Sequence, residues 1–455
     1  MFTSRTALIQ TNPPLLHYGA AVCDADGDGR FEFIVAGYGG PNRILGFRDG
    51  LLIDVGDRGF ADLNRQALGL AAGDFDGDGL EEIYLLNSDS FAGPKQVGDR
   101  LFRRAERGWI DLFAEPRNHA AQNRTAGRSI VAIDRTGKGR YGFFVANYGG
   151  PMRLFELGAD GDIVDAAPEA GLDLVAGGRC ATSLPILTPH MDLFVGNEGG
   201  SNFLFRNLGD GTFVNVASTW GLDDADEAAR GVAWFDADGD GRFDLALGNW
   251  EGPGRLFVRE KQGAFRDLAP TEWAQSARNR TIIAADFDND GREEIFFNNI
   301  GQPNRLFGWR RGTWTALDVG DAAESNGLGT GAAVADLDGD GRLELLIAHG
   351  ESGLQPLTYY HGPKTEHHWV RVMPLTPAGA PARGALVSLL QNDRTQIRVI
   401  DAGSGYLCQM EPVAHFGLGR AARIDSISID WPDGRQVVLT KPDPDQLHVV
   451  KHPGV

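Results

Sequence analysis

The chain has few cysteines and no long apolar run. Its three cysteines, Cys23, Cys180 and Cys408, are widely separated, odd in number and without CxxC spacing, which argues against a disulfide framework and a zinc site. No segment approaches the roughly 18 consecutive apolar residues of a membrane helix, so membrane insertion is not expected. The opening "MFTSRTALIQTNPP" lacks the apolar core of a secretory signal, so no export signal is predicted.

Basic residues and the common catalytic motifs are also scarce. The chain has 43 basic and 62 acidic residues and a net charge of -19, which disfavours nucleic acid and anionic lipid as partners. The sequence contains no HExxH or GxSxG motif, no phosphate-binding loop, and no GxGxxG motif at a strand-helix junction, so hydrolase and nucleotide-binding functions have little support. Cations are better candidate ligands.

What the chain does have is an acidic phrase, "DADGDGRFE" from Asp24 to Glu32, that recurs along the chain. Repeat units begin at Asp24, Asp74, Asp134, Asp236, Asp286 and Asp336, at intervals of 50, 60, 102, 50 and 50 residues. The interval of 102 spans two periods, and "MDLFVGNEGGSNFLFRN" (191–207) supplies the downstream half of the missing unit. The sequence therefore contains seven units.

Each unit reads as a small antiparallel meander. Short apolar runs such as "FEFIVAG" are separated by Gly, Pro, Asn and Asp, without a sustained helical period. Units of about 50 residues with several strands each are typical of propellers, which close radially and leave few exposed edges. We predict an all-β fold: a seven-bladed β-propeller over 1–360 and a small β domain over 361–455.

The acidic phrase has the ligand spacing of a calcium loop. Carboxylates stand at positions 1, 3, 5 and 9, a main-chain carbonyl is available at position 7, and glycine at position 6 permits a sharp turn. Position 12 of the first loop, Val35, lies in a strand-like run, so the loops join strands and are not EF-hands. The predicted ligands, with the position-7 residue contributing its carbonyl, are Asp24, Asp26, Asp28, Arg30 and Glu32; Asp74, Asp76, Asp78, Leu80 and Glu82; Asp236, Asp238, Asp240, Arg242 and Asp244; Asp286, Asp288, Asp290, Arg292 and Glu294; and Asp336, Asp338, Asp340, Arg342 and Glu344.

Five intact loops explain the acidity of the chain. Only 10 basic and 9 acidic residues fall in 361–455, so the excess of negative charge belongs to the repeats. About five Ca²⁺ ions, each with a structural role, would offset this charge and pin the turns. The alternative is a set of solvated Asp-Gly turns, but a turn needs one Asp and not four. In the third unit, Thr136 and Lys138 replace two carboxylates, and we hypothesise that Lys138 supplies the positive charge there.

Arginines recur in a second register. Arg128, Arg230 and Arg280 each lie six residues before the first Asp of a unit, and Arg179 is the counterpart in the fourth unit. Asn87, Asn147, Asn197, Asn249 and Asn299 recur at the end of the next strand. If the calcium loop joins the first two strands, both registers lie on the opposite face, near the axis. We hypothesise that the arginines bind an anionic group; the alternative is that these side chains brace adjacent blades or cap strand ends.

The sequence resembles two families. The loops and the "NRLF" phrases look like the FG-GAP or VCBS repeats of integrin-α-like propellers, and "HHWVRVMPL", "TQIRVIDAGSGYLCQMEPVAHFGLG" and "IDSISIDWPDGR" are similar to the ASPIC and UnbV domain. The combination resembles the cartilage acidic protein family, including its bacterial members. The resemblance implies a calcium propeller with an all-β C-terminal domain and an adhesion or partner-binding function, and it implies no reaction.

Two functional classes follow. The first is a calcium-stabilised binding protein whose partner is a protein or an anionic ligand, a glycan among the options. The second is a propeller enzyme of the lyase, dehydratase or alkylating type, with His119, His190 or Tyr148 as candidates; a deep pocket with a convergent His or Tyr and Arg would favour it, and a flat face would favour binding. Extracellular calcium loops bind at about 10⁻⁴ to 10⁻³ M, which favours an extracytoplasmic location.

Overall fold

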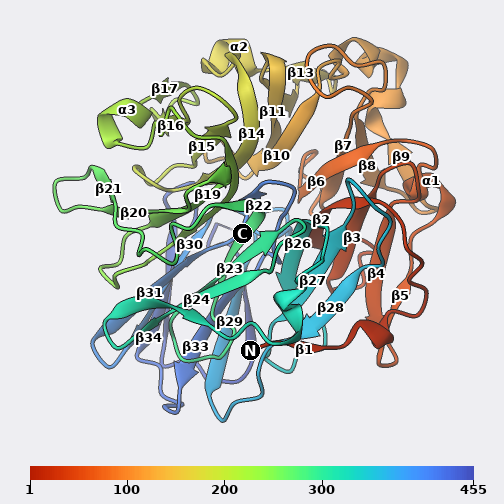
Figure 1. Cartoon of the computed structure of the whole chain (residues 1–455). Helices are drawn as coiled ribbons and strands as arrows, with labels where there is room; N and C mark the ends of the chain where they lie inside the picture. Colours follow the sequence, from red (N-terminus) through yellow and green to blue (C-terminus); the bar gives the residue numbers. More distant parts are fainter. Residues whose placement is uncertain (455) are drawn as a thin grey trace.

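The structure is a computed structural model, and it describes residues 1–454. Over these residues it contains seven four-stranded antiparallel sheets arranged as the blades of a propeller, followed by a smaller β domain (Figure 1). This confirms the predicted fold class. In Figure 1 the colours run around the ring from red to cyan, and the blue C-terminal strands lie against the green blades.

The blades follow the sequence repeats. Their strands, from the axis outward, are β2 (His17–Cys23), β3 (Glu32–Gly37), β4 (Arg43–Arg48) and β5 (Leu51–Asp54); β6 (Ala67–Gly73), β7 (Glu82–Asn87), β8 (Arg100–Arg104) and β9 (Trp109–Asp111); β10 (Gly127–Ile133), β11 (Gly142–Pro151), β12 (Arg153–Leu157) and β13 (Ile163–Asp165); β14 (Val175–Leu184), β15 (Asp192–Asn197), β16 (Phe203–Asn207) and β17 (Phe213–Asn215); β18 (Ala229–Phe235), β19 (Asp244–Gly252), β20 (Arg255–Arg259) and β21 (Phe265–Asp267); β22 (Ala277–Ala285), β23 (Glu294–Asn299), β24 (Arg305–Arg310) and β25 (Thr313–Leu317); and β26 (Gly329–Ala335), β27 (Glu344–His349), β28 (Thr358–His361) and β1 (Thr3–Ser4).

The seventh blade closes the ring. Its outermost strand, β1, comes from the start of the chain and pairs antiparallel with β28, with Thr3 opposite His361 and Ser4 opposite Tyr360. The short helical segments lie in connections: α1 (Arg58–Ala61), α2 (Ala167–Ala170), α3 (Ala217–Trp220), η1 (Thr6–Leu8), η2 (Leu112–Ala114), η3 (Pro116–Ala121) and η4 (Asp321–Ala323). No helix in residues 1–454 is long and apolar enough to cross a bilayer.

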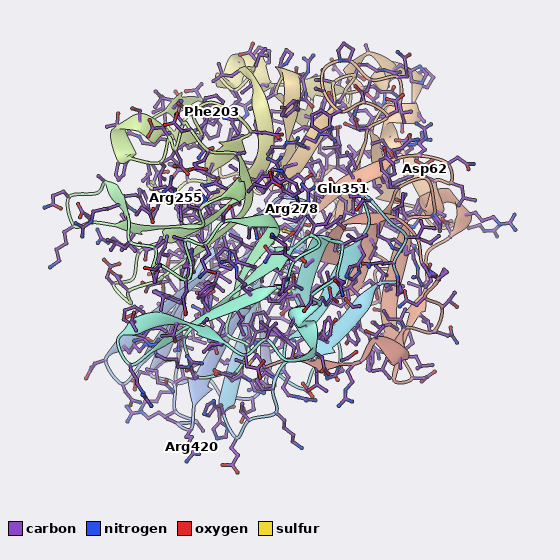
Figure 2. All side chains as sticks on the ribbon, in the orientation of Figure 1. Asp62, Phe203, Arg255, Arg278, Glu351 and Arg420 are labelled. Atoms are coloured by element: carbon purple, nitrogen blue, oxygen red, sulfur yellow. The ribbon has the colours of Figure 1, made fainter. Side chains whose placement is uncertain are left out.

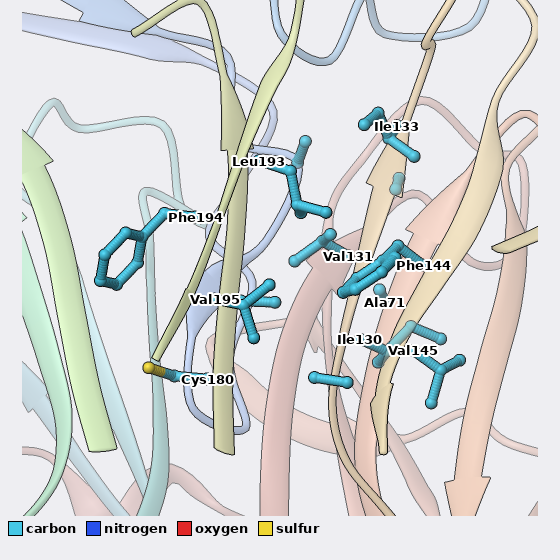
Figure 3. Packing of buried hydrophobic residues seen from close by; sticks show 14 of the residues in the cluster. Ala71, Ile130, Val131, Ile133, Phe144, Val145, Cys180, Leu193, Phe194 and Val195 are labelled. Carbon is cyan, nitrogen blue, oxygen red and sulfur yellow. The ribbon is translucent and has the colours of Figure 1, made fainter. Parts of the chain in front are cut away.

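The core lies between adjacent blades. Each inner strand is covered on both faces by neighbouring blades, so β3 and β7 are buried along their whole length, and their middle residues do not alternate between apolar and polar. Figure 3 shows this packing where Val131 of β10, Phe144 of β11 and Val195 of β15 meet; all three are fully buried.

The C-terminal domain has its own apolar core, which includes Val372, Val387, Phe416 and Ile429. It consists of β29 (His368–Pro374), β30 (Leu386–Gln391), β31 (Arg394–Val399), β32 (Ser404–Gly405), β33 (Ala414–Gly419), β34 (Ser426–Asp430), β35 (Gln436–Thr440) and β36 (Leu447–Val450). Its strands form two sheets, β33-β29-β36 and β31-β30-β34-β35, while β32 pairs with β14 of the propeller.

The C-terminal domain packs on the face of the propeller that carries the acidic loops. The Gly417 amide donates to Oδ2 of Asp286 at 3.0 Å, and Nη1 of Arg371 lies 3.0 Å from Oδ2 of Asp336. At the second loop, a Cβ added to Gly79 would meet the Ala378 carbonyl oxygen at 2.4 Å. The sheets of the C-terminal domain therefore do not cover the opposite face of the ring.

Candidate functional site

The five intact acidic loops share one local geometry. Each joins the first two strands of a blade, and the amide of position 7 donates to the position-5 carboxylate at 2.8 to 3.0 Å. The position-9 carboxylate accepts the amide of position 2 through one oxygen, at 2.8 to 3.1 Å. The glycines at positions 4 and 6 of the first loop, Gly27 and Gly29, have φ of 72° and 84°, which residues with a side chain rarely adopt.

The predicted ligands of these loops converge. In the loops of blades 1, 2, 5 and 7, three or more of the predicted carboxylates have oxygens within 4.8 Å of one another. Burial, and next the charge of Asp76, raise the pKa of Glu82 to about 8, and burial with the charge of Asp26 raises that of Glu32 to about 7. Oε1 of Glu344 is buried and has no hydrogen-bond partner among the described residues. Crowded, buried oxygens of this kind fit a hard divalent cation.

Neighbouring strands bring positive charge to the loops of blades 1, 2 and 6; in blade 2, Nη1 of Arg103 from β8 lies 3.4 Å from Oδ2 of Asp76. Nη2 of Arg48, from β4, lies 2.9 to 3.0 Å from carboxylate oxygens of Asp26, Asp28 and Glu32. Arg310, from β24, occupies the corresponding position in the sixth blade, with Nη2 2.8 Å from Oε1 of Glu294. These contacts indicate how strongly the clustered carboxylates attract a cation.

In the two degenerate loops, those of the third and fourth units, the carboxylates accept main-chain hydrogen bonds and form no such cluster. In the fourth unit, Oδ2 of Asp192 accepts the amides of Ile186, Leu187 and Thr188 at 2.6 to 3.2 Å. In the third, Asp134 accepts the Gly139 amide at 2.6 Å, while Lys138 forms no ion pair within the described chain. Main-chain donors thus neutralise these loops, and the hypothesised role of Lys138 gains no support.

The repeated arginines enter one pocket on the other face of the ring. The pocket has a volume of about 400 Å³, and its lining includes Arg128, Arg179, Arg230 and Arg280. Their residues are only 3 to 7% exposed. We call it the arginine pocket; the full lining is Tyr18, Tyr38, Leu68, Ser88, Asp89, Ser90, Phe91, Arg128, Arg179, Glu198, Arg230, Trp250, Arg280, Glu351 and Tyr406.

A β-bulge places the arginines there. In every blade the pairing between the innermost strand and the second strand shifts register near the start of the innermost strand, and the arginines fall at these shifts. A bulge leaves a residue unpaired and re-aims its side chain. The equivalent residues of the first two blades, Tyr18 and Leu68, line the pocket as well. Sequence reasoning missed both because it followed arginine alone.

Aromatic rings and carboxylates share the arginine pocket. The Arg280 guanidinium carbon lies 4.2 Å from the centre of the Trp250 ring, and that of Arg179 lies 4.6 Å from the centre of the Tyr148 ring. Glu198 pairs with Arg179 and with Arg230, the latter at 2.8 Å. Glu351, labelled near the middle of Figure 2, pairs with Arg280.

The arginines also bridge blades. Arg128 donates to the Phe91 carbonyl of the second blade, and Arg280 of the sixth reaches Glu351 of the seventh. Even so, the Nε atoms of Arg128, Arg230 and Arg280 are buried without a hydrogen-bond partner among the described residues. Bracing therefore uses only part of their donor capacity.

Four of the five repeated asparagines bond to their own turns, and the exception is Asn87, whose side-chain nitrogen and oxygen are buried without a hydrogen-bond partner among the described residues. The side-chain amide of Asn249 donates to the Pro253 carbonyl at 3.0 Å, and that of Asn299 to the Pro303 carbonyl at 2.7 Å. Asn197 does the same with the Ser201 carbonyl at 2.6 Å. For these residues the capping alternative describes the structure, and none of them lines the arginine pocket.

The histidines considered for an enzyme lie elsewhere. His119 is exposed in η3, where its Nε2 is 3.0 Å from the Ala114 carbonyl oxygen, and His190 lies in the degenerate fourth loop. A cavity of about 120 Å³ between the propeller and the C-terminal domain contains neither of them. Tyr148 contacts Arg179 beside the arginine pocket. Sequence reasoning also missed Tyr406 of the C-terminal domain, another phenol of the pocket lining.

The seventh loop has an additional neighbour that the repeat pattern does not contain. His361, at the end of β28, has a ring nitrogen grouped with carboxylate oxygens of Asp338 and Glu344 within 4.8 Å. Both of its ring nitrogens are buried without a hydrogen-bond partner among the described residues. The ligand spacing of the loop gave no signal for it, because His361 comes from another strand of the blade.

Comparison with known proteins matches both parts of the chain. The FG-GAP-like repeat family matches residues 24–85, 189–247, 236–297 and 286–347, and the ASPIC and UnbV family matches residues 376–455. Cartilage acidic protein 1 of Xenopus tropicalis is 44% identical over 96% of this chain and 74% of its own length. Cartilage acidic protein 1 of Homo sapiens is 43% identical over 96% and 73%.

Among solved structures, BBS1N in complex with ARL6DN covers 78% of this chain and 94% of its own, at 10% identity and a TM-score of 0.47, a likeness too distant to inform function. The identity to the curated relatives extends over nearly the whole chain, propeller and C-terminal domain together. The chain belongs to the cartilage acidic protein family.

Proposed function

We propose that this protein is a calcium-stabilised propeller that binds a partner through an anionic group held in the arginine pocket. The observation that carries the proposal is the convergence of four buried guanidinium groups from four successive blades, three of them with a partnerless Nε. Burial lowers the pKa of Arg128 and of Arg230, with the neighbouring charge of Arg179 contributing. An oxyanion bound among the four arginines would offset the repulsion between their positive charges and would accept hydrogen bonds from their unpartnered N–H groups.

The acidic loops support a structural role for Ca²⁺. Each intact loop offers a full set of oxygen ligands, of the hard type that Ca²⁺ prefers. Bound there, Ca²⁺ would neutralise carboxylates that otherwise repel one another and would fix the connection between the two inner strands of a blade. The chain's own residues shape the loop through the repeated amide-carboxylate hydrogen bonds.

We infer an extracytoplasmic location and an adhesion-type function. Sites of modest affinity, binding at about 10⁻⁴ to 10⁻³ M, are filled outside the cytosol, where calcium is abundant. The curated relatives carry the name of an extracellular tissue, cartilage. A face left free by the C-terminal domain and hollowed by a charged pocket suits the recognition of an acidic side chain or an acidic sugar.

The test is equilibrium binding of inorganic sulfate, inorganic phosphate and citrate, followed by the fluorescence of tryptophan, because Trp250 stacks on Arg280. Loss of one charge-assisted hydrogen bond should weaken binding roughly tenfold or more in Arg280→Gln. The matched control is Arg278→Gln, which alters an exposed arginine of the same strand that does not line the pocket; Arg278 is labelled in Figure 2. Equal affinities of wild type and Arg280→Gln would contradict the proposal.

Catalysis is the second candidate function, and one observation favours it. The pocket combines a phenol, Tyr406, with four arginines, an arrangement that can hold an anion and move a proton beside it. The same pocket serves both candidates, and they differ in whether Tyr406 exchanges a proton.

A further inference from the structure

One segment of the C-terminal domain runs along the propeller axis. We call residues 401–411 the axial segment. Near the acidic-loop face the Ala402 carbonyl accepts the Ala132 amide at 2.8 Å; deeper in, the Gly405 carbonyl accepts the Ser129 hydroxyl at 2.5 Å. The segment then returns, and the Glu411 amide donates to the Val334 carbonyl at 3.2 Å. Its turning point is Tyr406.

The inner strands hold the axial segment from several sides. The Leu407 carbonyl accepts the Ala20 amide at 3.1 Å, and Gln409 exchanges hydrogen bonds of 2.7 and 3.0 Å with the backbone of Ala72. A Cβ on Gly405, whose φ is 88°, would meet the backbone nitrogen and oxygen of Val232 at 3.0 Å, so only glycine fits. The position of Tyr406 is therefore fixed by the propeller.

The side chain of Tyr406 lines the arginine pocket. Its residue is 5% exposed, and its ring centre lies 5.7 Å from the guanidinium carbon of Arg280. The Thr281 hydroxyl donates to its carbonyl at 3.2 Å, which anchors the main chain. The phenol oxygen, in contrast, has no protein hydrogen-bond partner in the described part of the chain.

The charges around Tyr406 favour a negative group. The charged and titratable side chains that face it are Tyr18, Tyr38, Asp89, Arg128, Arg179, Glu198, Arg230, Arg280 and Glu351. Four positive charges against three carboxylates leave one positive charge in excess. Burial opposes ionisation of the phenol, but the charges of the four arginines outweigh it and place the pKa of Tyr406 below its ordinary value.

We propose that an oxyanion enters the arginine pocket together with a proton that Tyr406 takes up, so that the ligand's charge replaces that of the phenolate. The proposal rests on the proposed binding function of the pocket. At pH values above its pKa in the empty pocket, Tyr406 is a phenolate and acts as a counter-ion of the arginines. As the oxyanion enters, one proton from solvent forms the O–H bond of Tyr406, and the neutral phenol donates its hydrogen to the ligand. Release of the ligand reverses the step.

Proton uptake fixes the sign of the pH dependence. Above the pKa of Tyr406 in the empty pocket, every binding event must protonate the phenol first, so affinity falls about tenfold per pH unit. Below that pKa the phenol is already protonated before the ligand binds, so Tyr406 adds no pH dependence to the affinity. The ligand class is an oxyanion that can accept a hydrogen bond, a sulfate, phosphate or carboxylate group.

The experiment measures proton uptake directly. Wild type and Tyr406→Phe are titrated with sulfate, phosphate and citrate by calorimetry, in two buffers of different ionisation enthalpy, between about pH 7 and about pH 10, the ordinary pKa of a tyrosine. The tyrosinate absorbance is followed in parallel. Tyr406→Phe deletes a hydroxyl that bonds to no protein group, so the fold should be retained. Tyr359→Phe, which deletes another phenol hydroxyl without a hydrogen-bond partner among the described residues, but outside the pocket, is the matched control.

The outcomes separate the two proposals. We expect uptake of up to one proton and loss of tyrosinate absorbance in wild type and in Tyr359→Phe, and neither in Tyr406→Phe. Binding by wild type without proton uptake overturns this inference and leaves the proposed function standing. Failure of wild type to bind sulfate, phosphate or citrate contradicts both.

Discussion

Arg383 of the C-terminal domain forms a buried ion pair with Glu81, which belongs to the acidic loop of the second blade. Arg383 has no exposed surface, and its Nη2 lies 3.1 Å from Oε2 of Glu81. The same guanidinium also donates to the carbonyls of Asp401 and Val22, the first 2.5 Å and the second 3.2 Å away. One side chain thus ties the C-terminal domain, the axial segment and two blades together.

Removal of this arginine should be strongly destabilising. Arg383→Met would leave Glu81 buried without its partner, at a cost of about 3 to 5 kcal/mol in the free energy of unfolding. The double variant Arg383→Met/Glu81→Gln should recover much of that loss, because no charge is then stranded. Urea unfolding measures both. Arg423→Met, which breaks an exposed pair with Asp425, serves as the control and should leave the free energy of unfolding nearly unchanged.

Calcium removal should lower the melting temperature. We expect about five Ca²⁺ per chain by metal analysis, and a fall in melting temperature after EGTA that Ca²⁺ restores better than Mg²⁺, which demands tighter octahedral geometry. Asp74→Asn should lower the stoichiometry by about one ion. Asp134→Asn, in the loop neutralised by main-chain donors, should leave it unchanged. A chain with little calcium and an EGTA-insensitive melting temperature would refute the structural role of the metal.

Acid should destabilise the protein through His17. Burial, and next the charge of Arg43, lower the pKa of His17 to about 3. Between the ordinary pKa of about 6.5 and this value the unfolded chain binds a proton that the folded chain does not, so stability is lost as pH falls, by up to about 1.4 kcal/mol per unit. His17→Gln should flatten the pH slope between about pH 6 and pH 4.5, and His119→Gln, at an exposed site, should not. Identical slopes in wild type and His17→Gln would contradict the assignment.

Deletion of residues 1–4 should open the ring. These residues contain β1, and without it β28 becomes an exposed edge that can pair with another chain. We expect a lower melting temperature and concentration-dependent aggregation, measured by calorimetry and light scattering. Ser4→Ala, which keeps the backbone pairing, should behave like wild type. A truncated chain as stable and monomeric as the full chain would show that β1 is dispensable.

Features with a local period could be predicted from the sequence. Seven repeats, the strand-loop-strand placement of the acidic phrase and the spacing of Arg128, Arg230 and Arg280 all depend on residues close together in one unit. The Asn register had the same regularity, yet Asn249 and Asn299 bind their own turns. Periodicity identifies equivalent positions, and it does not say whether a side chain faces a ligand or its own backbone.

Features that depend on docking had no sequence signal. Tyr406 and Arg128 line the same pocket although 278 positions of sequence separate them. Only the glycines at 403 and 405 hinted at an unusual backbone near Tyr406. Glu351 shares a register with Asp89 and Glu251, 15 residues after the first Asp of the unit, yet Glu251 does not line the arginine pocket, and Glu198 stands outside this register. Such contacts are fixed by how the domains and blades pack, and a single sequence does not encode that packing in any local pattern.

The pairing of β1 with β28 also bears on how the protein is made. Strand β1 is synthesised long before its partner at residues 358–361, so the ring stays open while the residues between them are being synthesised. During that interval the unpaired blade edges and the unfilled axis are exposed and can form non-native contacts. The axial segment leaves later still. Ring closure and filling of the axis therefore come after synthesis of the seven blades, and a nascent chain that stalls before residue 411 is a natural target for chaperones and proteases.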